Sequence, residues 1–162
     1  MKPKNYQEVK AWNLFYVKEN TKNLHPALRN RRIISHRNDA VEFIKRYFSD
    51  MPVEECIVLG LGNRNNVIGF TTFKGETNQC AVYPRSVFRF LLTSGSASFI
   101  IAHNHPGTTK NPSEPDWILT NVLFKIGKAL DLPMMDHIIY NDSDEVTCMK
   151  ELPRWPGGAH EY

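Results

Sequence analysis

The sequence predicts an α/β fold in which a mixed β-sheet lies between helices that cover both of its faces. Two observations lead to this prediction. Segments with helical periodicity alternate along the chain with short apolar runs typical of buried strands, and turn residues separate them. The chain has 162 residues, of which 41% are hydrophobic and 23% are charged, so its size and composition suit one globular core.

Three regions divide the chain. Residues 1–32 form a polar N-terminal arm with no assigned role, residues 33–150 carry the alternating pattern of the domain, and residues 151–162 form an irregular tail. Within the arm, residues 12–17 suit either a strand or one helical turn. No apolar run reaches the roughly 20 residues of a membrane span, and no signal-peptide core follows the charged N-terminus. We therefore expect a cytoplasmic protein that does not enter the membrane.

The first half of the domain predicts one helix and two strands. The helix covers residues 38–49 and is capped by Asn38 or Asp39. Its apolar face comprises Val41, Ile44, Tyr47 and Phe48. The run 56–61 is apolar at nearly every position and predicts a strand that is buried on both faces, and residues 67–73 alternate loosely as a second strand.

The second half predicts two further helices and several strands. Residues 81–83 suit a short strand, and residues 84–94 predict a helix that begins at a proline and ends before a glycine. Residues 99–102 form an apolar strand, residues 114–130 a longer helix, and residues 137–149 a hairpin. In the helix at residues 84–94, the side chains predicted to face the core are Val87, Phe88, Leu91 and Leu92. In the helix at residues 114–130, they are Trp117, Leu119, Val122, Leu123, Ile126 and Leu130.

The most informative stretch joins the strand at 99–102 to the helix that follows it. The strand runs into His103-Asn104-His105, and Asp116 lies in the first turn of the helix. Side chains two residues apart on a strand point the same way, so His103 and His105 can face one point. Two imidazoles and one carboxylate leave a fourth tetrahedral position for water, which is the pattern of a catalytic zinc site. Zinc lowers the pKa of such a water to near neutrality and makes it a nucleophile.

Ser113 lies three residues before Asp116 and has two interpretations. Its hydroxyl could donate a hydrogen bond to a developing oxyanion or to the water on the metal. Alternatively, Ser113-x-x-Asp116 is a capping box that only starts the helix, and each histidine is an ordinary surface or core residue. Taken alone, Ser113-x-x-Asp116 is more simply a capping box, but the H-x-H spacing, the aspartate and the family resemblance of this stretch together favour the metal site.

These residues resemble a known family. His-x-His, seven residues and then Ser-x-x-Asp are similar to the JAMM (MPN+) metalloprotease motif, and the local sequence AHNHP…PSxxD resembles the RadC-like JAB family of bacteria. Residues 83–88 resemble the start of that family's hPREvf helix, and residues 135–139 resemble its LDHIII strand. The resemblance covers residues 33–149. The chain departs from the family pattern at Gly107, where the family usually has a serine, and at Ser86, where it has an acid.

The resemblance implies a JAB/MPN fold of the cytidine-deaminase-like type and a bound zinc ion. The zinc ligands would be His103, His105 and Asp116. It also implies a glutamate that acts as general base and lies just before an early apolar strand.

Two adjacent glutamates compete for this role. The RadC-like pattern places the base at Glu54, whereas the spacing of other JAMM proteases places it at Glu55. Neighbouring strand residues point to opposite faces, so at most one of the two can reach the metal. We favour Glu54 and keep Glu76 as a third, weaker candidate. The alternative without catalysis is a pair of exposed carboxylates at the start of a strand.

The resemblance implies a zinc-dependent enzyme that cleaves a peptide or isopeptide bond in a protein or peptide substrate. Two alternatives stay open: a RadC-type accessory protein of DNA repair, and a catalytically weak JAB scaffold that binds a metal or a protein partner. The helix-hairpin-helix module that RadC proteins commonly carry has no signature in residues 1–32. We expect Asp136 to orient one of the histidine ligands, and His137 to be an ordinary core or surface histidine.

Basic residues concentrate near the N-terminus. Residues 1–50 hold 11 Lys and Arg against 5 Asp and Glu, whereas residues 51–162 hold 9 against 12. The basic side chains that could associate weakly with nucleic acid are Lys22, Arg29, Arg31, Arg32 and Arg37. No helix-turn-helix, zinc-finger or RNP pattern accompanies them, so a solvated arm is the favoured interpretation.

The three cysteines, Cys56, Cys80 and Cys148, are isolated and odd in number. Because no CxxC pair occurs, they predict neither a disulfide framework nor a zinc ribbon. We expect each of them to be a small buried thiol.

Overall fold

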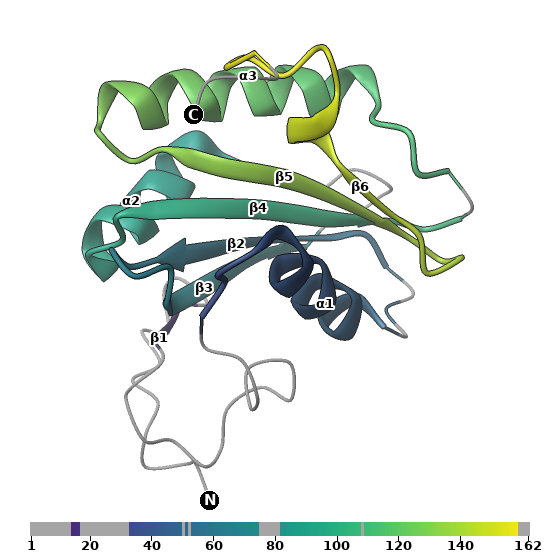
Figure 1. Cartoon of the computed structure of the whole chain (residues 1–162), viewed down its shortest axis with the longest axis horizontal. Coiled ribbons are helices and arrows are strands. Elements are labelled where there is room, and N and C mark those ends of the chain that lie inside the picture. Colours follow the sequence, from purple (N-terminus) through teal and green to yellow (C-terminus); the bar gives the residue numbers. More distant parts are fainter. Residues whose placement is uncertain are drawn as a thin grey trace, which may run out of the picture.

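The computed structural model describes residues 33–49, 51, 53–74, 82–107 and 109–158, together with the backbone of residues 14–16. Within these residues six strands form one mixed sheet in the order β1-β3-β2-β4-β5-β6 (Figure 1). The strands are β1 (Leu14–Tyr16), β2 (Glu55–Leu61), β3 (Val67–Lys74), β4 (Ser98–His105), β5 (Met134–Asn141) and β6 (Val146–Cys148). Neighbouring strands are antiparallel, except that β4 and β5 are parallel.

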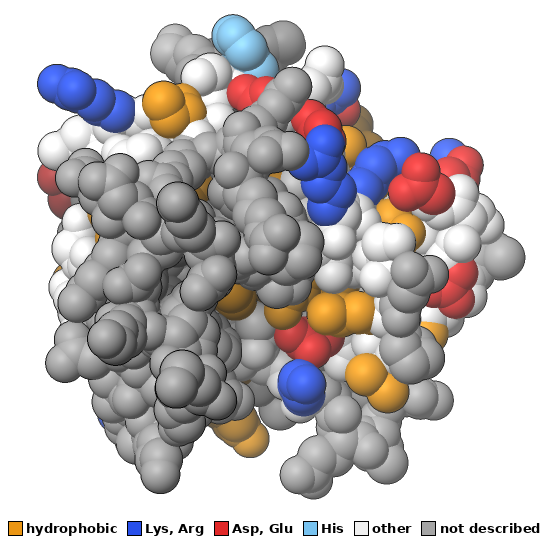
Figure 2. Space-filling view, turned by 90° about the horizontal axis from the view of Figure 1, so that it is seen from below, with side chains coloured by type: hydrophobic (Ala, Val, Ile, Leu, Met, Phe, Trp, Pro, Cys, Tyr) orange, Lys and Arg blue, Asp and Glu red, His pale blue; other side chains and the backbone are white. Residues whose placement is uncertain are grey.

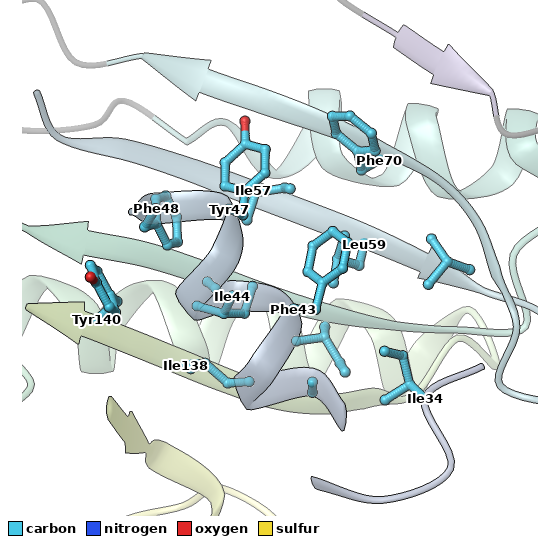
Figure 3. Close-up of a cluster of buried hydrophobic side chains, with 14 of the residues drawn as sticks. Ile34, Phe43, Ile44, Tyr47, Phe48, Ile57, Leu59, Phe70, Ile138 and Tyr140 are labelled. Atoms are coloured by element: carbon cyan, nitrogen blue, oxygen red, sulfur yellow. The ribbon is translucent and has the colours of Figure 1, made fainter. Parts of the chain in front are cut away.

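Helices lie on both faces of this sheet and confirm the predicted α/β class. Helix α1 (Arg37–Phe48) packs on one face, and α2 (Pro84–Ser94) and α3 (Glu114–Ala129) pack on the other. Each face has its own buried apolar cluster. Figure 3 shows the cluster under α1, to which Phe43 and Ile44 of the helix and Leu59 and Ile138 of the sheet belong.

Helix α1 begins slightly earlier than predicted. Its N-cap is His36, and the carboxylate of Asp39 accepts hydrogen bonds of 3.0 Å from the backbone N–H groups of Ser35 and His36. The predicted cap at Asn38 or Asp39 is therefore wrong in position. Asp39 lies in the first turn and reaches back to the orphan N–H groups at the helix start, as the acidic member of a capping box does.

The buried side of α3 also differs from the prediction. Trp117 and Leu123 are buried as predicted, but Thr120 and Gly127 complete the buried stripe. Three side chains of the predicted core are exposed instead: Val122, Leu130 and, in α2, Leu92. Apolar periodicity fails here because α3 approaches the sheet through small residues, and a Cβ on Gly127 would lie only 2.5 Å from the carbonyl oxygen of Leu132.

The predicted strands are largely confirmed. All of β2 is buried, β3 covers the predicted run, and β5 and β6 form the predicted antiparallel hairpin. Strand β4 continues past the apolar run through His105, so both histidines lie in regular strand. Val82 and Tyr83 are not in a strand, so the predicted short strand is wrong at these two positions. Its third member, Ala81, lies outside the described residues.

Several smaller predictions are settled by the described residues. In the N-terminal arm, residues 14–16 form β1 and pair with β3, which decides for a strand over a helical turn. Cys56 and Cys148 are buried free thiols as predicted, and Cys80 lies outside the described residues. None of the helices that the structure describes is both long and apolar enough to cross a membrane.

The connection from β4 through α3 to β5 positions the predicted site. Because β4 and β5 are parallel, their carboxyl ends meet at one edge of the sheet, where His105 pairs in register with Asn141. The chain leaves β4 at this edge and enters α3 at Glu114. The N-terminus of α3 therefore comes back to the strand end that carries the two histidines, which is a common location for ligand sites in α/β proteins.

Candidate metal centre

The three predicted metal ligands converge in the structure. The Nε2 atoms of His103 and His105 are 2.8 Å apart. The carboxylate of Asp116 faces both rings, with Oδ1 3.2 Å from Nε2 of His103 and Oδ2 3.4 Å from Nε2 of His105. One donor atom from each residue can be chosen so that all lie within 4.8 Å of one another. Two nitrogens and a carboxylate thus share one small volume.

Strand geometry places the two histidines side by side. They are two residues apart on β4, so both side chains point to the face covered by α2 and α3. In register, His103 pairs with Cys56 of β2 on one side and with Ile139 of β5 on the other. This central position explains why only 5% of the His103 side chain is exposed, compared with 19% for His105.

The loop between β4 and α3 is tied to the β5–β6 turn. The backbone N–H of Gly107 donates to the Asp142 carboxylate at 2.6 Å, and the N–H of Asp142 donates back to the Gly107 carbonyl at 3.0 Å. Farther along, Lys110 pairs with Glu145 at 3.0 Å. Gly107 has a φ of +117°, a backbone conformation that favours glycine. These contacts fold the loop back and bring α3 to the histidines.

Asp116 serves its helix and faces the histidines at the same time. Its Oδ2 accepts hydrogen bonds from the backbone N–H of Ser113 at 2.7 Å and from the Ser113 hydroxyl at 2.6 Å. The two interpretations of Ser113-x-x-Asp116 are therefore compatible, because the capping box holds the carboxylate toward the rings. Burial raises the pKa of Asp116, but the hydrogen bonds that His103 and His105 donate when protonated, together with the charge of protonated His103, hold that pKa well below its usual range. The group is a carboxylate at neutral pH.

His105 presents an unprotonated nitrogen to the centre. Its Nδ1 lies 3.3 Å from the carbonyl oxygen of Thr109, which can only accept, so Nδ1 carries the proton in the neutral ring. The pKa of His105 is raised chiefly because the protonated ring can donate a hydrogen bond from Nε2 to Asp116, and partly by the charges of Asp116 and Glu54. The ring is thus a basic nitrogen ligand held in an anionic environment.

The donor set and its spacing fit a metal ion. With bonds of about 2.0–2.1 Å, a tetrahedral zinc ion separates neighbouring ligand atoms by about 3.3 Å. The observed separations of 2.8, 3.2 and 3.4 Å bracket this value. Neutral imidazole and carboxylate are ordinary ligands of zinc and other first-row divalent ions. The three side chains can therefore hold a metal ion.

The two candidate glutamates lie on opposite faces of the sheet. Glu55 points to the α1 face, where its carboxylate accepts a 2.6 Å hydrogen bond from the Tyr47 hydroxyl and lies 3.8 Å from the Lys74 ammonium. Burial and this carboxylate raise the pKa of Tyr47. Cys56, the next residue, pairs with His103, so alternation puts Glu54 on the face of the histidines. The structure thus brings Glu54 toward the centre and turns Glu55 away from it. Glu76 lies outside the described residues.

Sequence reasoning missed three residues around the centre. Asn104, between the two histidines in the sequence, is buried on the opposite face of the sheet, whereas His137 and Thr120 are fully buried behind His103. His137 lies 2.9 Å from Nδ1 of His103, the position proposed from sequence for Asp136. Asp136 instead accepts hydrogen bonds from the backbone N–H groups of His137 and Lys150. The resemblance of residues 135–139 pointed to this strand, but no sequence signal marked Thr120.

The fold and the site define a class: an α/β domain whose mixed sheet presents a His-x-His pair that, together with an aspartate, could hold a metal ion. The family model described as RadC-like JAB domain matches residues 34–154. This chain belongs to the RadC-like JAB domain family, which confirms the resemblance.

Relatives of known sequence agree with this family. A UPF0758 protein of Bacillus pumilus is 32% identical over 124 residues, which cover 76% of this chain and 55% of the relative. A UPF0758 protein of Shouchella clausii is 38% identical over 113 residues, covering 69% of this chain and 49% of the relative. The chain spans about half the length of these relatives, and their names state no activity.

Proposed function

We propose that this chain is a zinc-dependent hydrolase of the JAMM type that cleaves an amide bond in a peptide or isopeptide substrate. One observation carries the proposal: His103, His105 and Asp116 converge within metal-binding distance of one another on the sheet face to which alternation assigns Glu54. A site of this kind needs metal ligands and one nearby carboxylate that can move a proton. Membership of the JAB family supports the same proposal.

The chain's own residues have separate tasks in this mechanism. A bound zinc ion would supply an acidified water and polarise the substrate carbonyl. Glu54 takes a proton from the attacking water and returns it to the leaving nitrogen, which is the usual double role of a general base in amide hydrolysis. Ser113 holds the Asp116 carboxylate with its hydroxyl and its N–H, and in this geometry its proton points to Asp116.

Metal analysis and a hydrolysis assay together test the proposal. The purified protein is expected to hold one zinc ion per chain and to cleave members of a mixture of unstructured peptides, followed by mass spectrometry. The double variant His103→Ala, His105→Ala should lose both properties, whereas His36→Ala, which removes an exposed histidine at the start of α1, should lose neither. Wild-type protein that holds no more zinc than the double variant would refute the proposal.

The nucleic-acid alternative has no support from the described surface. Four of its five basic residues lie outside the described residues, and the fifth, Arg37, pairs with Glu151. Lys45 pairs with Asp144, and Arg46 pairs with a glutamate one turn earlier. Figure 2 views the molecule from below the orientation of Figure 1 and shows acidic and basic side chains intermixed on the part of this face that grey atoms do not cover. An association of the basic arm with nucleic acid stays a prediction from the sequence.

A further inference from the structure

A chain of buried hydrogen bonds runs from His103 back to the helix that carries Asp116. Nδ1 of His103 lies 2.9 Å from Nε2 of His137, and Nδ1 of His137 lies 2.7 Å from the hydroxyl of Thr120. That hydroxyl lies 2.7 Å from the backbone carbonyl oxygen of Asp116. The side chains of His137 and Thr120 are completely buried. No solvent molecule is needed to complete the chain, because each contact joins two protein atoms.

The backbone carbonyl oxygen of Asp116, at the end of this series of hydrogen bonds, determines which atom donates in each of them. A carbonyl oxygen can only accept, so the single proton of the Thr120 hydroxyl goes to Asp116. The hydroxyl oxygen must then accept from Nδ1 of His137. The neutral His137 ring has only one N–H, so its Nε2 accepts from His103. Nδ1 of His103 therefore carries the proton, and its Nε2, the atom that faces His105 and Asp116, has a free lone pair.

The opposite direction would leave one contact inside this hydrogen-bond chain without a proton. If the Thr120 hydroxyl donated to His137, its oxygen and the Asp116 carbonyl oxygen would be two acceptors 2.7 Å apart with no proton between them. Buried polar atoms without a partner cost about 1–3 kcal/mol each. His137 is completely buried, and burial disfavours the charged form of an imidazole, so the ring is neutral.

We propose that Thr120 and His137 act as positioning residues that lock His103 in the tautomer whose Nε2 can bind the metal. The inference rests on the proposed function in one respect, because it assigns these residues to the same metal centre. The carbonyl of Thr109 imposes the same tautomer on His105. The protein thus protonates the outer nitrogen of both rings, leaving two lone pairs directed at the centre.

Thr120→Val is the sharpest variant, because valine keeps the shape of threonine and removes only the hydroxyl. The buried N–H of His137 then has no acceptor, and the ring can take the other tautomer and push a proton onto Nε2 of His103. We expect zinc affinity, measured by competition with a chromogenic chelator, to fall by about ten- to a hundredfold. Thr120→Ser should restore it. Thr71→Val is the matched control: it removes the hydroxyl of another buried threonine, on β3, and should leave the zinc affinity unchanged.

The tautomer itself can be read in the zinc-free wild-type protein. Long-range ¹H–¹⁵N spectra of the histidine rings, recorded above the pKa of free histidine, should show Nδ1 of both His103 and His137 as protonated nitrogens. An unprotonated Nδ1 in His103 would overturn the inference, as would a folded Thr120→Val protein with wild-type zinc affinity. Wild-type protein that shows the expected tautomers but binds no zinc would instead overturn the proposed function, so the two failures are distinguishable.

Discussion

The side chain of Asn104, which lies between the two histidines of the candidate metal centre in the sequence, is hydrogen-bonded to the segment that carries the candidate general base. Its oxygen accepts a 2.7 Å hydrogen bond from the backbone N–H of Glu55, and its amide donates to the carbonyl oxygen of Val53 at 2.9 Å. Asn104 is only 1% exposed, so these bonds are formed without competition from water. The asparagine between the histidines thus fixes the backbone on both sides of Glu54.

Replacing Asn104 by alanine should therefore reduce hydrolysis without removing the metal ligands. The N–H of Glu55 and the carbonyl of Val53 would lose their partners, which costs about 1–3 kcal/mol of stability for each buried group. We expect kcat to fall while zinc affinity stays close to that of the wild type. Asn104→Asp is a graded control, because aspartate can still accept from Glu55 but cannot donate to Val53. Wild-type turnover in Asn104→Ala would show that this backbone segment needs no such support.

The two adjacent glutamates should differ sharply when each is changed to glutamine. Glu54→Gln should keep zinc and lower the rate by about a hundredfold or more, since glutamine cannot move a proton. Glu55→Gln should retain activity, because its amide oxygen can still accept from the Tyr47 hydroxyl on the α1 face. Peptide cleavage and zinc content measured on both variants check this prediction. The opposite result would assign the general base to Glu55.

Ser113→Ala should weaken zinc binding as well as the start of α3. The change removes the 2.6 Å hydroxyl bond to Asp116 but leaves the backbone N–H bond to the same oxygen. Loss of an N-cap side chain costs about 0.5–2 kcal/mol, which urea unfolding would detect. Ser113→Thr should restore most of both effects. If kcat fell with zinc affinity unchanged, Ser113 would act on the substrate and not through Asp116.

Asp136 should make the protein less stable at neutral pH than at mildly acidic pH. Burial raises the pKa of Asp136 to about 6, although backbone hydrogen bonds from Lys150 and His137 oppose the shift. The folded protein therefore favours the protonated acid. This stabilisation is fully present below the unfolded pKa of about 4 and is lost as the pH rises through the folded pKa.

The comparison with Asp136→Asn isolates this effect, because asparagine has no such titration. Relative to the variant, the wild type should lose up to about 3 kcal/mol of unfolding free energy between pH 4 and 7, at about 1.4 kcal/mol per pKa unit. Urea denaturation of both proteins across this range provides the measurement. Parallel pH profiles for the two proteins would contradict the prediction.

Gly127→Ala should destabilise the protein although alanine is the better helix former. A Cβ at this position would lie 2.5 Å from the carbonyl oxygen of Leu132 and 3.1 Å from the Phe99 ring. Crowding of a packed core costs about 1–3 kcal/mol, more than the gain in helix propensity of about 1 kcal/mol. The exposed neighbouring change Lys128→Ala should alter the melting temperature little. An increase in stability for Gly127→Ala would show that α3 can move away from the sheet.

Local sequence was sufficient for the fold class and for the three metal-ligand candidates. The alternation of side chains on a strand places His103 and His105 on one face, and a helix start returns Asp116 to them. Both relationships depend on residues that are close in the chain. The Ser113 capping box was likewise readable, because it spans only one helical turn.

Only the tertiary structure showed which of Glu54 and Glu55 lies on the sheet face of the histidines, and only it revealed the residues behind His103. Alternation shows that two neighbouring residues face opposite ways, but the pairing of Cys56 with His103 is needed to say which of them faces the histidines. Thr120 and His137 meet because α3 packs on β5, and neither helical nor strand periodicity encodes that contact. Periodicity reports which residues share a face of one element, whereas packing between elements determines what that face touches.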